Sequence, residues 1–181
     1  MKTESNVMYI IRLAAILLII TSLVAAALAG VNSITAPVIA RLTAEKTQMA
    51  IEAVLPGGGE AIDFAPVDLV SKVYKGENGY AIEVTPGGFD NTITMMVGVD
   101  FEGKVLGIDI IKHTETAGLG AVADAETPAG QNFRGQFVGT SGSVAVTKDG
   151  GAMDSITGAT ITSRAICDGV NAALACVATL G

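Results

Sequence analysis

Histidine, cysteine and tryptophan are scarce in this sequence of 181 residues, which has one histidine, two cysteines and no tryptophan. A structural zinc site usually takes four cysteine and histidine ligands, and no such spacing is present. Cys167 and Cys176 are nine residues apart in one helical pattern, which separates them by about 13.5 Å of helical rise and places them on opposite faces. They therefore cannot bridge each other. The sequence predicts two free thiols in a core and no metal site.

Positive charge is also in short supply, with 11 Lys and Arg against 18 Asp and Glu and a formal net charge of −7. The N-terminal residues Lys2, Glu4 and Arg12 sum to +1, so the rest of the chain carries −8. A surface of this sign repels phosphate groups. The composition therefore excludes nucleic-acid binding, and adhesion to anionic lipid headgroups, as the function of the acidic part.

Charge of either sign is missing between Arg12 and Arg41. Residues 13–31 are almost continuously apolar, and as a helix they would extend about 28 Å, against a hydrocarbon core of about 30 Å. A signal peptide is the alternative, because Lys2 precedes the run and residues 27–29 resemble a cleavage site. The run exceeds the about 7–15 apolar residues of most signal peptides, which favours a retained membrane span.

The orientation of this span is not decided by charge. Lys2 and Arg12 flank one side, and Arg41 and Lys46 flank the other. The positive-inside rule needs an excess of Lys and Arg on one side. The two sides are nearly balanced, so the topology depends on other arguments.

The polar segment 32–37 predicts a turn into a second helix, because Pro37 suits the first helical position. The Pro-Gly-Gly-Gly run at residues 56–59 ends that helix. Strand periodicity then appears at residues 69–74, 80–84, 92–99 and 105–111, with a clear hairpin turn at 100–104. We therefore predict an α+β fold with an antiparallel sheet and flanking helices. The expected division is a transmembrane helix within 1–31, a connecting helix within 32–60 and a domain at 61–181.

A run of small residues marks the start of the last predicted helix. Gly158 and Ala159 leave room for a large group to approach the hydroxyl of Thr160. A phosphate on Thr160 would lie at a helix N-terminus, where backbone N–H groups and the helix dipole favour an anion. Thr162 and Ser163 are predicted N-caps. The alternative interpretation is an ordinary turn followed by an N-capped helix.

The same run resembles the flavinylation motif of FMN-binding domains, Asp-x-x-(Ser/Thr)-Gly-Ala-Thr. It matches at every specified position, namely Asp154, Thr157, Gly158, Ala159 and Thr160. The resemblance implies that Thr160 carries FMN through a phosphoester bond. No histidine or lysine adjacent in sequence could activate this weak hydroxyl nucleophile. The resemblance accordingly implies a separate flavin transferase that uses FAD, with Asp154 as a recognition residue.

A second motif lies at residues 113–120. A metal site on His113 and Glu115 is one interpretation and a plain surface loop is another. The segment also resembles the His-x-Glu-Thr-Pro-Gly-Leu-Gly loop of FMN-binding domains, although Ala117 stands where that family has proline. The resemblance implies flavin contacts from His113, Glu115, Thr116, Gly118, Leu119 and Gly120. Arg134 is a further candidate for neutralising a phosphate, with an ordinary surface arginine as the alternative.

The order of these motifs behind one N-terminal span resembles the family of G subunits of Rnf electron-transport complexes over nearly the whole chain. This resemblance implies a protein that relays electrons through covalent FMN within a ferredoxin:NAD oxidoreductase that pumps Na⁺ or H⁺. It also implies partner subunits with iron–sulfur clusters, a place in the cell membrane, and an extracytoplasmic C-terminal domain.

Three other classes share features with this chain. The C subunits of Na⁺-translocating NADH:quinone reductases carry the flavinylation motif but are longer. A membrane-anchored FMN-binding sensor would bring a signalling domain or further helices. A structural anchor protein would carry no cofactor, so flavin fluorescence in a denaturing gel separates it from the other classes.

Overall fold

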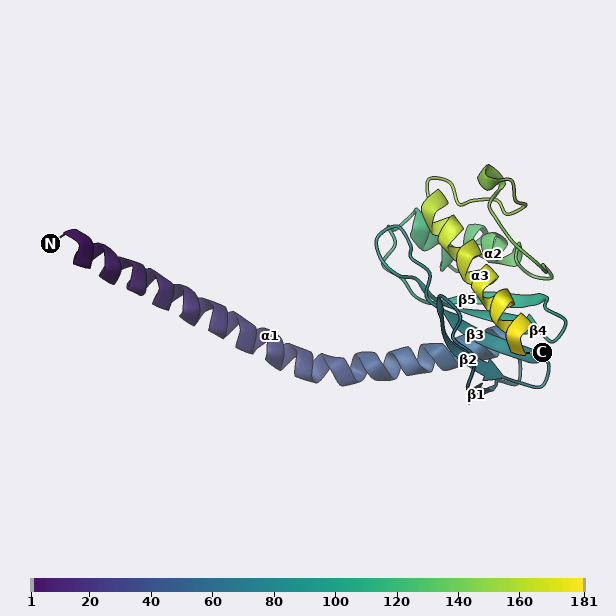
Figure 1. The fold of residues 1–181 in the computed structure, drawn as a ribbon, viewed down its shortest axis with the longest axis horizontal. Coiled ribbons are helices and arrows are strands. Elements are labelled where there is room, and N and C mark those ends of the chain that lie inside the picture. Colours follow the sequence, from purple (N-terminus) through teal and green to yellow (C-terminus); the bar gives the residue numbers. More distant parts are fainter. Residues whose placement is uncertain (1, 181) are drawn as a thin grey trace. The chain divides into compact units, whose positions relative to one another are not determined.

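The computed structural model describes the backbone of residues 2–180 and the side chains of residues 7–180. The chain divides into two compact units, Met1–Ala44 and Glu45–Gly181. Its elements, drawn in Figure 1, are α1 (Lys2–Val54), β1 (Glu60–Ile62), β2 (Val70–Lys75), β3 (Gly79–Val84), β4 (Thr94–Asp100), β5 (Val105–Lys112), η1 (Gly120–Ala123), α2 (Pro128–Gly135), η2 (Thr147–Asp149) and α3 (Thr160–Leu180).

The first unit is the N-terminal part of α1, and its large apolar side chains are exposed. Ile10, Leu17 and Leu28 are each more than 60% exposed. An 18-residue window within Val7–Val54 has a mean hydropathy of 2.6 and contains no buried residue. Such a surface is unfavourable in water and favourable in lipid. The helix fits a single-pass membrane protein, as the sequence predicted.

α1 continues through Pro37 without interruption, so the turn predicted at residues 32–37 is wrong. The polar residues that suggested a turn bond to the helix itself. The hydroxyls of Ser33 and Thr35 donate to carbonyls one turn back, at 2.8 and 3.0 Å. Proline removes one backbone donor, and helices in membranes can accommodate this loss.

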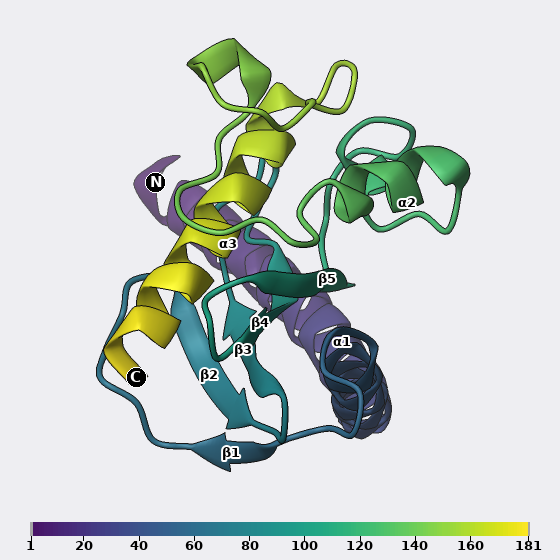
Figure 2. The same ribbon diagram turned by 90° about the vertical axis from the view of Figure 1, so that its right-hand side faces the viewer.

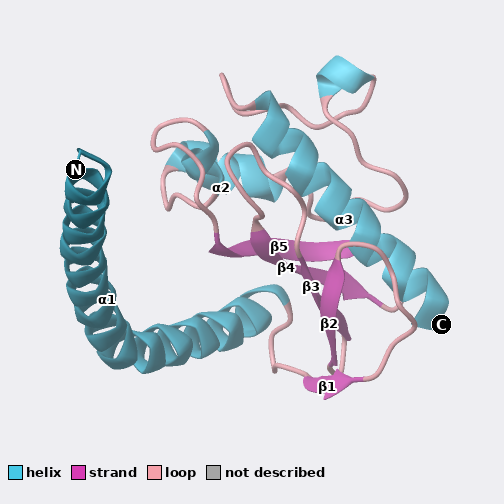
Figure 3. Ribbon diagram, turned by 60° about the vertical axis from the view of Figure 1, so that its left-hand side comes forward, coloured by secondary structure: helices cyan, strands magenta, loops and turns pink. Residues whose placement is uncertain are grey.

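The second unit is built on a five-stranded antiparallel sheet in the order β1-β2-β3-β4-β5. The four predicted strands are confirmed as β2 to β5, and the three-residue β1 was not predicted. The predicted hairpin is also confirmed. The Asp100 carboxylate closes its turn by accepting from the N–H groups of Glu102 and Lys104 at 2.9 and 2.8 Å. Figure 3 distinguishes the strands from the helices that flank them.

Both faces of the sheet are covered, which explains why β3 is buried along its whole length. α3 lies across one face (Figure 2), where Ile166 and Val170 pack on alternate residues of β3 and β4. On the other face, the last turns of α1 supply Ile51 and Val54. A Cβ atom on Gly98 would overlap the Val54 carbonyl, so glycine lets this helix approach the sheet. The predicted α+β fold is confirmed.

Two segments distant in sequence meet at the N-terminal end of α3. One is the loop after β5, and its Glu115 bonds to Thr162 of α3. The other is the loop that contains η2, beside the start of α3 in Figure 2, where Lys148 bonds to Thr160. The first contact joins the two predicted motifs. The second contact adds the loop that lies between these motifs in the sequence.

Candidate functional site

A cleft of about 270 Å³ opens at the N-terminal end of α3. It is bordered by the loop after β5, by the first turn of α3, by η2 and by the turn after β3. The structure therefore brings the two predicted motifs together. The lining residues are Phe89, Glu115, Thr116, Leu119, Gly120, Lys148, Gly158, Ala159, Thr160, Ile161 and Thr162.

α3 begins at Thr160, and Ala159 holds its N-cap position. The Ala159 carbonyl accepts from the Ser163 N–H at 3.0 Å. Within residues 2–180, the N–H groups of Thr160, Ile161 and Thr162 donate to no carbonyl or side-chain oxygen. Unpaired donors at a helix start form a site for an anion.

Thr162 and Ser163 lie inside the first turn of α3, so their prediction as N-caps is wrong. The Ser163 hydroxyl is fully buried. It accepts from the Ile156 N–H at 3.0 Å and donates to the Ala159 carbonyl at 3.0 Å. It thereby fixes the loop that leads into the helix. Thr162 borders the cleft and donates to Glu115 at 2.5 Å.

Glu115 joins three parts of the site. Its side chain accepts from the N–H groups of Phe89 and Asp90 at 2.9 and 3.4 Å, besides the Thr162 hydroxyl. The residue is only 8% exposed, and a Cβ atom on Gly120 would lie 2.5 Å from its carboxylate. A buried carboxylate with three donors is well satisfied. Glu115 therefore fixes the shape of the cleft.

His113 lies behind Glu115 and does not line the cleft. Its Nδ1 accepts from the Glu115 N–H at 3.2 Å, and its Nε2 faces the Asp124 carboxylate at 3.5 Å. Because Nδ1 is an acceptor, the proton of the neutral ring is on Nε2. The ring holds the Glu115 backbone in place. No group of three or more metal-ligating side chains occurs in the described part of the chain.

Three large apolar side chains form an exposed rim around the cleft. Phe89 is 66% exposed, Ile161 49% and Leu119 43%. Exposed apolar side chains that converge on a concave site are typical of ligand-binding regions. Phe89 and Ile161 were not predicted as site residues. Phe89 follows a Gly-Gly turn signal, and nothing in its own spacing distinguishes it from other turn residues.

Lys148 is the other site residue that the sequence did not reveal. Its Nζ donates to the Thr160 Oγ1 at 2.9 Å, across 12 residues of sequence. The sequence places no lysine next to this hydroxyl, and the fold brings Lys148 to it from outside the motif. The contact depends on how η2 folds back, which no local pattern indicates.

The remaining predicted residues lie around a neighbouring cleft of about 510 Å³, which is lined by Gly118, Asp154 and Thr157. Leu119 faces Gly158 within the first cleft, where a Cβ atom on Gly158 would lie 2.9 Å from the Leu119 Cδ2. Gln136 holds the Asp154 backbone through two hydrogen bonds, at 2.7 and 3.3 Å.

The Asp154 carboxylate makes no hydrogen bond or ion pair within the described chain. Asp154 itself is exposed, and its only hydrogen bonds in residues 2–180 are those of its backbone to Gln136. A carboxylate of this kind is accessible to another protein. The position is consistent with the recognition role that the motif implies.

The family model of the FMN-binding domain matches residues 88–175, which includes both predicted motifs and the whole cleft. The chain is 33% identical over 175 residues to the G subunit of the ion-translocating oxidoreductase complex of Methanosarcina acetivorans, covering 87% of this chain and 89% of that protein. This chain belongs to that family of G subunits. The G subunit of the Na(+)-translocating ferredoxin:NAD(+) oxidoreductase complex of Acetobacterium woodii is 30% identical over 94% of this chain and 92% of its own length.

A third relative, the G subunit of the ion-translocating oxidoreductase complex of Yersinia pestis, is 48% identical over 99 residues, which are 52% of this chain and 47% of that protein. Family membership confirms FMN as the cofactor of the domain. The cleft fits this group on three observations of its own. It has unpaired N–H donors and a lysine at one end for a phosphate, and an apolar rim for a planar ring.

Proposed function

We propose that this chain is the membrane-anchored electron relay of an ion-translocating oxidoreductase complex and that its FMN is esterified to Thr160. The main support for attachment at this residue is the position of Thr160. It ends the flavinylation motif, begins α3 and borders the cleft. A phosphate on its Oγ1 would lie beside three unpaired backbone N–H groups. Thr157 and Thr162, the neighbouring hydroxyls, lack this combination.

Attachment needs a donor and an enzyme. In the proposed reaction a flavin transferase joins the Thr160 oxygen to the FMN phosphorus of FAD. The pyrophosphate bond of FAD breaks, AMP leaves, and the hydroxyl proton is released. Asp154 is the proposed recognition residue, because its carboxylate is exposed on the neighbouring cleft.

The residues of the cleft have different proposed roles in binding the flavin: some hold the loops in position, and others contact the ring. Glu115, fixed by His113, keeps the Phe89 turn and the first turn of α3 together. Thr116, Leu119 and Gly120 would lie along the ring, and Gly118 would let the loop follow it, with a φ of +76°. Bound FMN supplies one- and two-electron redox chemistry, which the surrounding contacts tune.

The proposed partners are the other membrane and iron–sulfur proteins of the complex. The name of the Acetobacterium woodii relative gives ferredoxin, NAD(+) and Na(+). We propose that electrons pass between ferredoxin and NAD in this complex as well, coupled to Na⁺ or H⁺. We place the domain outside the cytoplasm. A covalent tether suits that location, because flavin lost there could not be replaced from the cytoplasmic pool.

The proposed parts of the chain are the cytoplasmic N-terminus and span at 1–31, a connecting segment at 32–60, in which α1 continues to Val54, and the flavin domain at 61–181. The span is proposed to remain in the mature protein. A mature N-terminus at Gly30 would contradict that proposal.

Electron transfer in the assembled complex tests the relay role. Membranes that contain the complex with Thr160→Ala should keep the mutated chain and its partners and lose electron transfer between ferredoxin and NAD. Thr179→Ala, at the other end of α3, is the matched control and should keep the activity. Full activity in the Thr160→Ala complex would overturn the proposal.

A further inference from the structure

η2 directs an ammonium group onto the proposed attachment oxygen. Lys148 Nζ donates to Thr160 Oγ1 at 2.9 Å, although Lys148 is an exposed residue with room to extend into solvent. An exposed lysine side chain has about 2 kcal/mol of rotamer entropy to lose when it is fixed. A contact of this kind therefore needs something that holds the backbone of η2 in place.

An ion pair beside Lys148 provides that support. Arg164 donates to both oxygens of Asp149, from Nε at 2.6 Å and from a terminal nitrogen at 2.7 Å. The hydrogen bond from Arg164 lowers the pKa of Asp149, so the pair is charged at neutral pH. Thr160 and Arg164 are four residues apart and lie on the same face of α3. Two consecutive residues of η2 thus contact two consecutive turns of the helix.

Lys148 is also the one cation that lines the cleft within residues 2–180. The other charged residue there is Glu115, whose oxygens are occupied by Phe89, Asp90 and Thr162. Arg134, the candidate from the sequence, is engaged elsewhere. It donates to the Ala123 carbonyl at 2.7 Å and to Glu126 at 2.8 Å.

We propose that Lys148 is the counter-ion of the phosphate that joins FMN to Thr160 and that it positions this phosphate during flavin transfer. The inference rests on the proposed attachment at Thr160. The phosphorus would be bonded to the oxygen that Lys148 already contacts, and a phosphodiester carries one negative charge. An ammonium group has three donors and no acceptor. It can therefore hold phosphate oxygens, but it does not act as the base that removes the hydroxyl proton.

The test is the initial rate of flavin attachment to the full chain in detergent, with a purified flavin transferase and FAD. Lys148→Met should be labelled about tenfold more slowly than wild type, the lower end of the contribution of a hydrogen bond to a charged group. Lys148→Arg keeps the charge and should recover most of the rate. Lys104→Met is the matched control, since Lys104 is an exposed lysine paired with Glu102 at 3.3 Å, and it should react like wild type.

Salt separates a charge effect from a structural one. The gap between wild type and Lys148→Met should narrow as ionic strength rises, because salt screens an exposed charge. A gap that does not change with salt would overturn the counter-ion role. Lys148→Gln is a second charge-removing variant with the same expectation, and it keeps the test decisive if Lys148→Met folds poorly.

The controls also separate this inference from the proposal on which it rests. Labelling of wild type but not of Thr160→Ala supports the attachment site. If Lys148→Met then matches wild type, the role of Lys148 alone is overturned. If wild type takes no flavin, the attachment itself is wrong and the role of Lys148 fails with it.

Discussion

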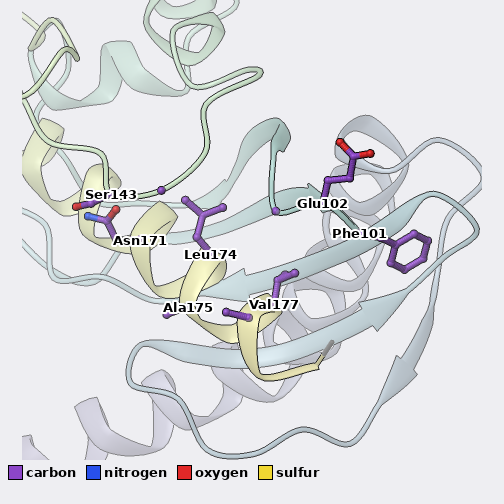
Figure 4. Close-up of a pocket in the computed structure, with 10 residues that line it drawn as sticks. Phe101, Glu102, Ser143, Asn171, Leu174, Ala175 and Val177 are labelled. Atoms are coloured by element: carbon purple, nitrogen blue, oxygen red, sulfur yellow. The ribbon is translucent and has the colours of Figure 1, made fainter.

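Two hollows border α3, one at each end, and they differ in both size and chemistry. The groove beside the C-terminal half has a volume of about 620 Å³, against about 270 Å³ for the cleft at the N-terminal end. Figure 4 shows side chains that line the groove, including Phe101, Asn171 and Leu174. The Asn171 amide already exchanges two hydrogen bonds with the Val144 backbone, at 2.8 and 2.9 Å. Among the described residues, α3 therefore offers the groove no free polar side chain to hold a ligand.

The smaller hollow has what the larger one lacks. Its end of α3 presents unpaired N–H groups and the positive end of the helix dipole, while the other end presents carbonyls. Lys148 adds a charge, and Glu115 fixes the walls. The polarity of the helix and its unpaired donors therefore identify the binding site better than the volume of the cavity does.

The largest expected difference between the two ends is the loss of covalent flavin. Thr160→Ala should carry none, because it lacks the oxygen that would bond to phosphorus. Thr179→Ala removes a hydroxyl that donates to the Cys176 carbonyl at 2.7 Å, and it should keep all of its flavin. Flavin fluorescence in a denaturing gel measures both. Equal flavin labelling of the two variants would show that the N-terminal end of α3 is not the attachment site.

The next largest difference is the loss of protein stability when a glutamate at each hollow is replaced by alanine. Glu115→Ala leaves the Thr162 hydroxyl and two backbone N–H groups without their acceptor, which should cost about 2 kcal/mol. Glu102→Ala removes only an exposed pair with Lys104 and should cost less than about 0.5 kcal/mol. Thermal unfolding of the full chain in detergent checks both values. Similar melting temperatures would show that Glu115 does not join the three segments.

Aromatic residues at the two hollows offer a subtler comparison. Phe89 at the cleft and Phe101 at the groove are both exposed. Phe89→Ala should change stability by less than about 0.5 kcal/mol, whereas Phe101→Ala also removes an edge-to-face contact with the Tyr80 ring, at 5.3 Å between centroids, and should cost about 0.5–1.5 kcal/mol. Only Phe89→Ala should change the environment of the flavin ring. Quenching of flavin fluorescence by iodide should increase in that variant and remain at the wild-type level in Phe101→Ala. The reverse result would place the ring away from the Phe89 rim.

The smallest effect concerns thiol reactivity within α3. Burial raises the pKa of the Cys167 thiol to about 11, and burial also raises the pKa of Cys176. Because the thiolate is the reactive form, alkylation of the folded protein at pH 8 should be slow and should accelerate toward pH 11. Urea-unfolded protein should react quickly at pH 8. Fast alkylation of the native chain at that pH would contradict the buried positions.

Much of this architecture could be predicted from sequence because its signals are local. The strands β2 to β5, the Asp100 hairpin and the apolar N-terminal helix each follow from a continuous pattern. The two motifs also supplied most residues of the cleft. Thr160 and Glu115 are 45 residues apart, and only their resemblance to one family suggested that they share a site.

The site residues that the sequence did not predict correctly have physical explanations. Lys148 and Phe89 reach the cleft through the fold of two loops, and neither has a local signal. Thr162 and Ser163 were predicted as N-caps because hydroxyl side chains usually hold that position. α3 instead begins with Ala159 as its cap, and its N–H groups stay free of partners within residues 2–180. Functional sites often depart from local preferences in this way.

The most direct test of the account is the mass of one peptide. Trypsin cleavage after Lys148 and Arg164 releases residues 149–164, which contain Thr157, Thr160 and Thr162. In protein produced with an active flavin transferase, fragmentation should place one FMN phosphoester on Thr160 and none on the other two threonines. An unmodified peptide, or FMN on Thr157 or Thr162, would contradict the central claim.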